Sequence, residues 1–327
     1  MADYLYGSAR VRALENRLIG RERMGLLPDE RDAASIWARL CEYGIEPVRG
    51  ADGAILREES LLSILQGAYG AVREMMPDDP VARTWLYPYD CNNIKAAIKG
   101  FVRSIDPRSM MFDFGTVDTD DVIDMVRENR FEGLPMHMQA AAVEATEAYA
   151  KTNDPQRVDL TLDRACYADM LAASAGEPFC NALVKRKLDL TNLLSLIRVL
   201  RMKSGEAGKQ LLMDAWIEGG SLSTAFMEEQ YEKGEESLWR ELRRGEYARF
   251  AHGLSDASSL TEIERQADGC FMDKLREVKF VPFGAEVITA YLLATECEVR
   301  NLRIILAGKE AGLSAKTIRE RIREGYV

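Results

Sequence analysis

The 327-residue chain is poor in the residues that build metal sites. It has only two histidines, His137 and His252, far apart in the sequence, and its six cysteines are scattered without a CxxC pair. Because zinc ligands cluster along a chain, this distribution argues against a structural zinc site. Scattered thiols are typical of a reducing compartment. We expect no metal and no cofactor.

Long apolar segments and an excess of positive charge are also missing. No apolar run reaches about 18 residues without a charge, so no segment is expected to span a bilayer. The start of the chain, Met1-Ala-Asp-Tyr-Leu, has no apolar signal region. The formal net charge of −10 argues against broad nucleic-acid binding, because phosphate contacts need concentrated Lys and Arg. We expect a soluble, intracellular protein that binds no nucleic acid.

Catalytic motifs are nearly absent. The sequence has no GxxxxGK[ST], GxGxxG, HExxH or GxSxG, so we expect no nucleotide binding and no such chemistry. Asp120-Asp121-Val-Ile-Asp124 does match DDxxD, the motif with which helical isoprenoid synthases hold Mg²⁺ and diphosphate. Their second metal motif is missing, and acids at the start of a helix are favoured by its dipole. An enzyme that uses Asp120, Asp121 and Asp124 with Mg²⁺ is an alternative interpretation.

The most informative feature present is a short phrase that occurs three times. Each copy has an acid, two variable residues, an asparagine and an aliphatic residue, with a second aliphatic residue four positions later. The copies are Asp90-Cys-Asn-Asn93-Ile94, Asp189-Leu-Thr-Asn192-Leu193 and Glu298-Val-Arg-Asn301-Leu302. They recur at a spacing of about a hundred residues, which indicates one structural unit built three times.

The acid and the asparagine of each phrase lie on one face of a helix, one turn apart. An asparagine side chain donates and accepts hydrogen bonds, whereas a carboxylate only accepts them. We predict that each pair fastens its helix to a neighbouring backbone turn. The alternative is that the three carboxylates converge on one ligand or metal, but buried polar groups that satisfy the fold are far commoner.

Helical periodicity extends along nearly the whole chain, and strand patterns are scarce, so we predict an all-α fold. The segments 183–203 and 285–307 read as long buried helices, and Ser60 reads as a helix N-cap. Small-residue helix starts recur at Gly7-Ser8, Gly115-Thr116, Gly220-Ser221 and Gly312-Leu-Ser314. These patterns predict helical lobes over 1–110, 111–214 and 215–327, the last with a closing C-terminal helix.

Three cations follow the first phrase at a regular interval. Lys95, Lys99 and Arg103 lie at i, i+4 and i+8 and therefore form a stripe along one helix face. A solvated face explains such a stripe, and so does a basic surface presented to an acidic partner protein. Both interpretations stay open at this point.

The phrases resemble one protein family. Asp90-Cys-Asn-Asn93-Ile94-Lys95 is similar to the D-x-x-N-I-K stretch of the C subunit of V/A-type ATPases, the homologue of the eukaryotic d subunit (the AC39 family). The stretch from Glu298 to Lys309 and the closing stretch from Ile318 to Val327 resemble the C-terminal part of the same family. The middle copy departs most, with Leu194 where the other copies have Lys95 and Arg303.

This resemblance implies three pseudo-threefold-related helical lobes that form a funnel-like body in the central stalk of a rotary ATPase or ATP synthase. It implies a non-catalytic rotor subunit, on the cytoplasmic face of the membrane, that joins the rotating shaft of the D and F subunits to the proteolipid c/K ring during proton or sodium transport. A generic helical adaptor is a further alternative, although repeat arrays stack many units of about 30–45 residues. Other subunits determine whether the complex makes or hydrolyses ATP and whether it moves H⁺ or Na⁺.

Overall fold

The computed structural model describes residues 4–77, 79–202 and 205–327. Within these ranges the regular secondary structure is helical, with no strand and a single isolated antiparallel bridge between Arg49 and Ile55. The all-α prediction is confirmed. The predicted helix over 183–203 is α9, although Lys203 lies outside the described residues.

The contacts between residues divide the chain into two compact units. Unit 1 contains residues 1–77 and 236–327, and unit 2 contains residues 78–235. The three lobes at 1–110, 111–214 and 215–327, and the funnel they would form, stay predictions.

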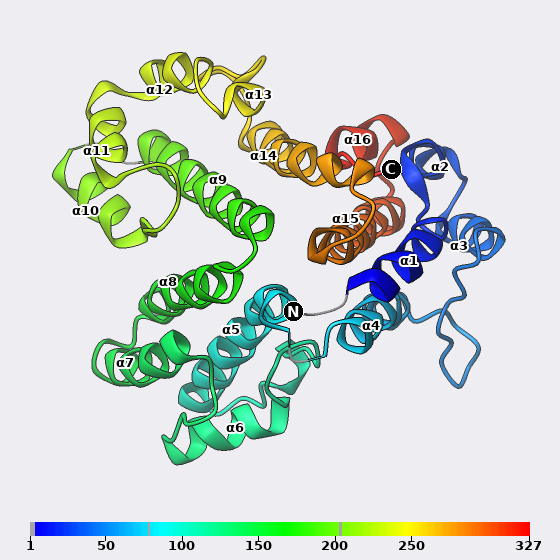
Figure 1. Ribbon diagram of the computed structural model, residues 1–327, viewed down its shortest axis with the longest axis horizontal. Coiled ribbons are helices and arrows are strands. Elements are labelled where there is room, and N and C mark those ends of the chain that lie inside the picture. Colours follow the sequence, from blue (N-terminus) through cyan, green and yellow to red (C-terminus); the bar gives the residue numbers. More distant parts are fainter. Residues whose placement is uncertain (1–3, 78, 203–204) are drawn as a thin grey trace. The chain divides into compact units, whose positions relative to one another are not determined.

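Unit 2 is built around three long helices that pack in sequence (Figure 1). Helix α5 packs on α8, α8 packs on both α7 and α9, and α9 packs on α10. The elements are α5 (Pro80–Arg103), η2 (Arg108–Met110), α6 (Thr119–Glu128), α7 (Met136–Thr152), α8 (Pro155–Ser174), α9 (Pro178–Met202), α10 (Glu206–Ala215) and α11 (Thr224–Lys233). Pro80 occupies the first turn of α5, where its missing N–H has no intrahelical partner to lose.

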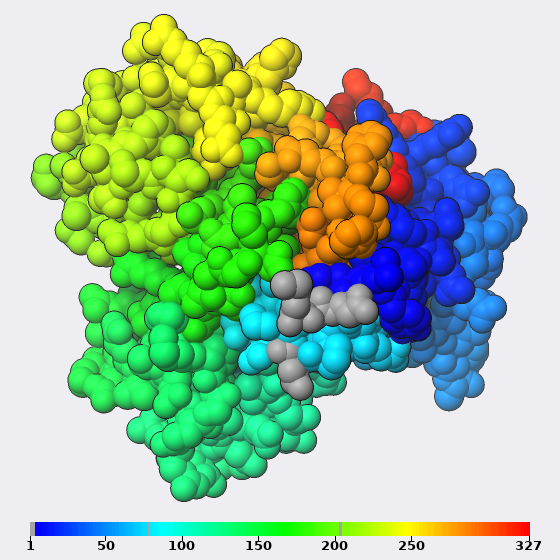
Figure 2. Space-filling view, viewed as in Figure 1, coloured from blue at the N-terminus to red at the C-terminus, as the bar shows by residue number. Residues whose placement is uncertain are grey.

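Unit 1 joins the two ends of the chain around one buried helix. Helix α15 packs on α1, α3 and α4, and α16 packs on α15. In Figure 2 the red C-terminal residues lie beside the blue N-terminal ones. The elements are α1 (Tyr4–Glu15), α2 (Gly20–Leu26), η1 (Leu27–Asp29), α3 (Ala33–Glu42), α4 (Arg57–Met75), α13 (Ala248–Ala251), α14 (Leu260–Arg276), η3 (Glu277–Phe280), α15 (Ala285–Glu310) and α16 (Ala315–Arg321). Helix α12 (Glu235–Leu242) begins at the boundary of the two units.

Two local predictions are wrong. Ser60 is no N-cap: it lies inside α4, where its hydroxyl donates to Leu56 O and accepts from Val48 N. The Gly7-Ser8 pair lies inside α1 and does not start it. Gly7 faces Ile288, where a Cβ atom would come within 2.7 Å of its side chain, so this glycine serves close helix packing.

Candidate functional site

The first acid–asparagine pair lies on α5 and binds the segment that leads into α6. The Asn93 amide donates to Phe112 O at 2.8 Å, and its oxygen accepts from Phe112 N at 2.9 Å. The Asp90 carboxylate accepts from Thr116 N, Thr116 Oγ1 and Val117 N at 2.7–3.1 Å. Both Asp90 and Asn93 are fully buried. The pair therefore satisfies backbone groups in a connection that forms no regular hydrogen-bond ladder.

The second pair repeats this arrangement on α9. The Asn192 amide donates to Ile217 O at 2.7 Å, and its oxygen accepts from Ile217 N at 3.0 Å. The Asp189 carboxylate accepts from Ser221 N at 2.8 Å and from Leu222 N at 3.2 Å. These bonds hold the connection between α10 and α11, and both side chains of the pair are fully buried.

The third pair lies on α15, and its two members bind opposite ends of the chain. The Asn301 amide donates to Arg323 O at 3.0 Å, and its oxygen accepts from Arg323 N at 2.8 Å, in the segment after α16. The Glu298 carboxylate accepts from Ile19 N and Gly20 N, at the start of α2, at 3.1 and 3.0 Å. This carboxylate thus ties the N-terminal segment to the C-terminal helices of unit 1.

A glycine stands directly before the first N–H group that each aspartate binds, but not before the first one that Glu298 binds. A Cβ atom on Gly115 would lie 2.1 Å from Asp90 Oδ1, and one on Gly220 would lie 2.0 Å from Asp189 Oδ1. The residue before the bound Ile19 is Leu18, so no glycine stands at the corresponding place in the third copy. Because glutamate is one methylene longer than aspartate, we infer that it reaches its backbone partners without the close approach that requires glycine.

Burial also changes the electrostatics of the third carboxylate. Desolvation raises the pKa of Glu298 above its ordinary value, while the hydrogen bonds from Gly20 and Ile19 act in the opposite direction. Desolvation is the larger effect, as is usual for a carboxyl group removed from water.

The basic stripe on α5 faces acids of the neighbouring helix within unit 2. Lys95 Nζ lies 2.6 Å from Asp163 Oδ1, and Lys99 Nζ lies 2.5 Å from Asp159 Oδ1, both on α8. Burial lowers the pKa of the Lys95 ammonium group, but the negative groups beside it outweigh this effect and raise the pKa overall. Arg103, the last cation of the stripe, is exposed. A partner-binding role for Lys95, Lys99 and Arg103 stays a prediction, and Arg103 is the member best placed for it.

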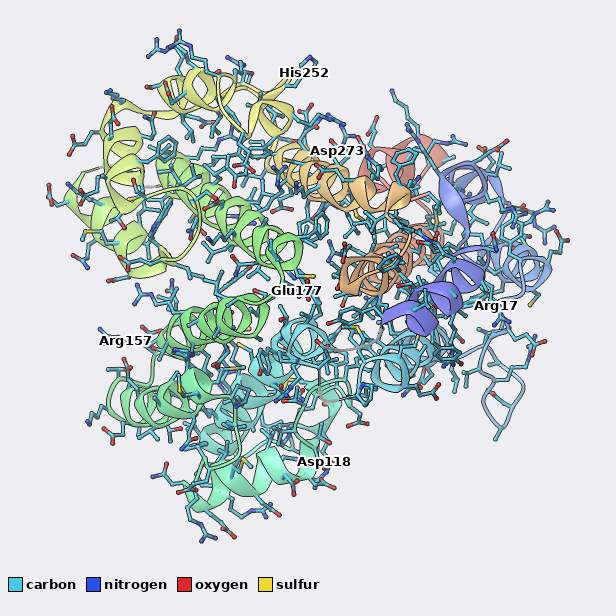
Figure 3. The ribbon with its side chains drawn as sticks, in the orientation of Figure 1. Arg17, Asp118, Arg157, Glu177, His252 and Asp273 are labelled. Atoms are coloured by element: carbon cyan, nitrogen blue, oxygen red, sulfur yellow. The ribbon has the colours of Figure 1, made fainter. Side chains whose placement is uncertain are left out.

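The DDxxD residues occupy the first two turns of α6. Asp118, labelled in Figure 3, caps this helix by accepting from Asp120 N. Asp120 pairs with Arg108 at 2.8 Å, and Asp124 pairs with Arg127 at 2.5 Å. In the three described ranges, no group of His, Cys, Asp or Glu side chains comes together as a metal site.

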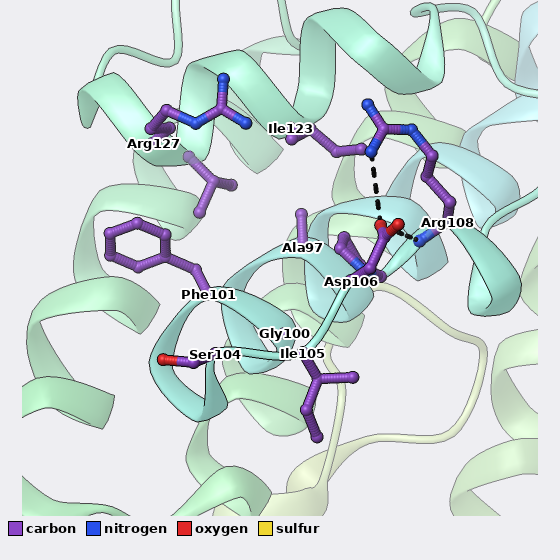
Figure 4. Close-up of a pocket in the computed structure, with 11 residues that line it drawn as sticks. Ala97, Gly100, Phe101, Ser104, Ile105, Asp106, Arg108, Ile123 and Arg127 are labelled. Atoms are coloured by element: carbon purple, nitrogen blue, oxygen red, sulfur yellow. Dashed lines mark hydrogen bonds and ion pairs between the residues drawn. The ribbon is translucent and has the colours of Figure 1, made fainter.

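A partly open cavity lies between the end of α5 and α6 (Figure 4). Its volume is about 380 Å³, and its apolar lining includes Phe101, Ile105 and Ile123. The polar side of the cavity holds an ion pair between Asp106 and Arg108 at 3.4 Å. The apolar lining favours packing with an apolar group over chemistry on a polar substrate.

One buried acid that resembles these pairs was missed in the sequence. Asp169 on α8 accepts from His137 N at 3.0 Å and from Met138 N at 2.9 Å, and it lies 2.7 Å from His137 Nδ1. It therefore holds the start of α7. No asparagine follows Asp169 three residues later, so the repeated phrase gave no indication of this contact.

No helix within the described part of the chain combines the length and apolarity needed to cross a membrane. The partners described for the three acid–asparagine pairs are backbone groups and one hydroxyl of the chain itself. These observations define an all-helical protein whose repeated polar residues bind backbone groups of the chain itself.

Comparison with known proteins identifies the family. The sequence model of the ATP synthase (C/AC39) subunit family matches residues 8–321, so the chain belongs to this family. The C subunit of the A-type ATP synthase of Halorubrum lacusprofundi is 27% identical, over 97% of this chain and 96% of that protein. The corresponding C subunits of Thermococcus onnurineus and Methanosarcina mazei are 24% and 25% identical, each over 98% of this chain and over 90% and 93% of their own lengths.

Family membership confirms the resemblance found in the sequence. The family comprises a structural subunit of a larger complex and not a catalytic enzyme, and the chain is a rotary ATPase subunit. The alternative of an isoprenoid-synthase-like enzyme is therefore set aside.

Proposed function

We propose that this chain is a central-stalk subunit that couples the rotating shaft of the D and F subunits to the proteolipid c/K ring of a rotary ATPase. In this role it works at the cytoplasmic face of the membrane, as a peripheral subunit, during proton or sodium transport. The observation that carries the proposal is the family match over residues 8–321.

The three acid–asparagine pairs support a mechanical role. Each pair joins a long helix to a connection outside that helix, through several hydrogen bonds inside the protein. Hydrogen bonds to a charged group contribute about 1.5–3 kcal/mol each, roughly twice the contribution of neutral ones. Connections held in this way resist displacement under load, which suits a body that must transmit torque without bending.

Repetition supports the same role. Three copies of one helical unit fit a three-lobed socket around a rotation axis, in which each lobe presents an equivalent edge to the shaft. The third pair would connect the first and last parts of the chain in such a socket, because Glu298 on α15 binds the backbone of residues 19 and 20.

Binding of purified subunits tests the proposal. The full chain, immobilised, is offered the D–F shaft and the detergent-solubilised proteolipid ring in separate experiments. We expect both to be retained, and retention of neither would refute the coupling role.

The basic stripe is tested in the same assay. Arg103→Glu should weaken capture of one partner if that partner presents an acidic surface there. Arg244→Glu is the matched control, because Arg244 is also exposed and follows α12, away from the stripe in the sequence. Equal capture by both variants and the wild type would show that Arg103 is not part of the interface.

A further inference from the structure

The structure of unit 1 contains a small arginine-rich pocket beside the third acid–asparagine pair. Its volume is about 300 Å³, and it is bounded by α2, α14, α15, α16 and the segment after α16. The lining includes four arginines, Arg21, Arg265, Arg319 and Arg323, and two glutamates, Glu298 and Glu324. The chain carries a formal net charge of −10, whereas the arginines of this lining outnumber its glutamates.

Two of these arginines have their charge matched within the protein. Arg319 pairs with Asp29, and Arg323 Nε lies 3.0 Å from Asp268 Oδ2. Arg323 also lies 3.9 Å from Glu264 through Nη2 and donates to Thr261 O through Nη1, so its guanidinium is held by groups of unit 1.

The other two arginines have no matched charge. In the part of the chain that the structure describes, neither the Arg21 nor the Arg265 guanidinium makes an ion pair or a hydrogen bond. Arg21 is exposed and Arg265 is half-buried. They come from different elements, α2 and α14, and both line this pocket.

The two glutamates of the lining do not supply the missing negative charge. The Glu298 carboxylate is occupied by Ile19 N and Gly20 N, and burial raises its pKa. Glu324 pairs with Arg249 at 3.1 Å and lies 3.4 Å from Arg276 Nη1. The pocket therefore keeps an excess of guanidinium donors.

We propose that this pocket binds a small multivalent oxyanion of the phosphate or pyrophosphate class. The planar guanidinium group matches a phosphate group with paired hydrogen bonds, which makes arginine the side chain best suited to such anions. A bound anion would connect α2, α14 and the segment after α16. It would thereby stabilise the region that the Glu298–Asn301 pair holds together. This site is independent of the proposed coupling function.

Titration calorimetry of the full chain with sodium pyrophosphate tests the proposal, with sodium chloride at matched ionic strength as the control for screening. We expect saturable binding and a rise in the melting temperature with pyrophosphate, because a ligand that binds only the folded state stabilises it. No binding heat and no rise in melting temperature up to about 5 mM, a weak-binding limit, would refute the proposal.

Two variants locate the site. Arg21→Gln combined with Arg265→Gln should weaken binding by at least about tenfold, since each substitution removes charge-assisted hydrogen bonds. Arg244→Gln, which removes one exposed charge outside the pocket, should bind as the wild type does. Unchanged affinity in the double variant would refute the assignment. If the double variant shows an altered far-ultraviolet circular dichroism spectrum, Arg21→Gln alone provides the same comparison.

Discussion

The substitution Asn192→Leu tests directly whether an acid–asparagine pair holds its helix to the neighbouring connection. Leucine has a similar size but cannot form the two hydrogen bonds that Asn192 makes with Ile217 N and Ile217 O. Because Asn192 is fully buried, water does not replace the lost partner. Ile217 is also buried, so its N–H and C=O groups would both be stranded.

The magnitude follows from the cost of leaving buried polar groups without partners. Each stranded group costs about 1–3 kcal/mol, and leucine regains part of this through apolar contacts, so we expect a net loss of about 2–4 kcal/mol. With a urea dependence of about 2 kcal/mol per molar, the unfolding midpoint falls by about 1–2 M. Trp216 precedes Ile217 and is buried, so its fluorescence reports unfolding close to the changed site.

Amide hydrogen exchange gives a second, local measurement. The Ile217 amide should exchange faster in the variant, because its hydrogen bond to Asn192 Oδ1 is gone. The control is Asn16→Leu, since Asn16 is exposed and makes only a 3.4 Å bond to Arg12 O. An unchanged midpoint together with unchanged exchange at Ile217 would refute the structural role of the pair.

Three further predictions concern contacts within each unit. Gly220→Ala places a Cβ atom 2.0 Å from Asp189 Oδ1 and should lower the free energy of unfolding by about 2–4 kcal/mol. The control is Gly176→Ala, which has open space around it and should change the stability in urea by less than about 1 kcal/mol. Equal effects of the two substitutions would contradict the close-approach argument. Burial raises the pKa of Glu298 above its ordinary value of 4.5, so its contribution to stability is fully present below that value and is lost as pH rises through the raised pKa. The stability of the wild type relative to Glu298→Gln should therefore fall with rising pH in this range, and a constant difference from pH about 4 to 8 would disprove it. A double-mutant cycle with Lys95→Met and Asp163→Asn should give a coupling energy of about 0.5–1 kcal/mol. The coupling energy is small because the Asp163 side chain is 45% exposed to solvent. A coupling energy of zero would show that this 2.6 Å ion pair does not stabilise the fold.

The long helices and the positions of the polar pairs could be predicted because they depend on local pattern. Apolar residues at helical spacing define α9 and α15, and an acid and an asparagine three residues apart must share a helix face. The backbone partners could not be predicted, because they lie at different distances along the chain in each copy. For Glu298 they lie near the opposite end of the chain, at residues 19 and 20.

The sequence of α5 alone could not show whether its charged face contacts solvent, a partner protein or another helix of the same chain. The sequence favoured a solvated face for Lys95 and Lys99, with a partner-binding surface as the alternative, yet both lie against acids of α8. Asp159 and Asp163 have the same four-residue spacing as the two lysines, and this match was the signal that could have revealed the packing of α5 on α8. Asp169 had no such signal, because a single acid within a helix carries no local indication of a distant partner.

The central claim is that this chain couples shaft rotation to ion movement, and the most direct test uses the whole rotary ATPase in proteoliposomes. ATP hydrolysis and ATP-driven ion transport are measured together, with and without this subunit, and again after it is added back. We predict that complexes without the subunit lose ion transport, and that the added subunit restores the ratio of ions moved to ATP hydrolysed. An unchanged ratio in complexes that lack the subunit would contradict the account.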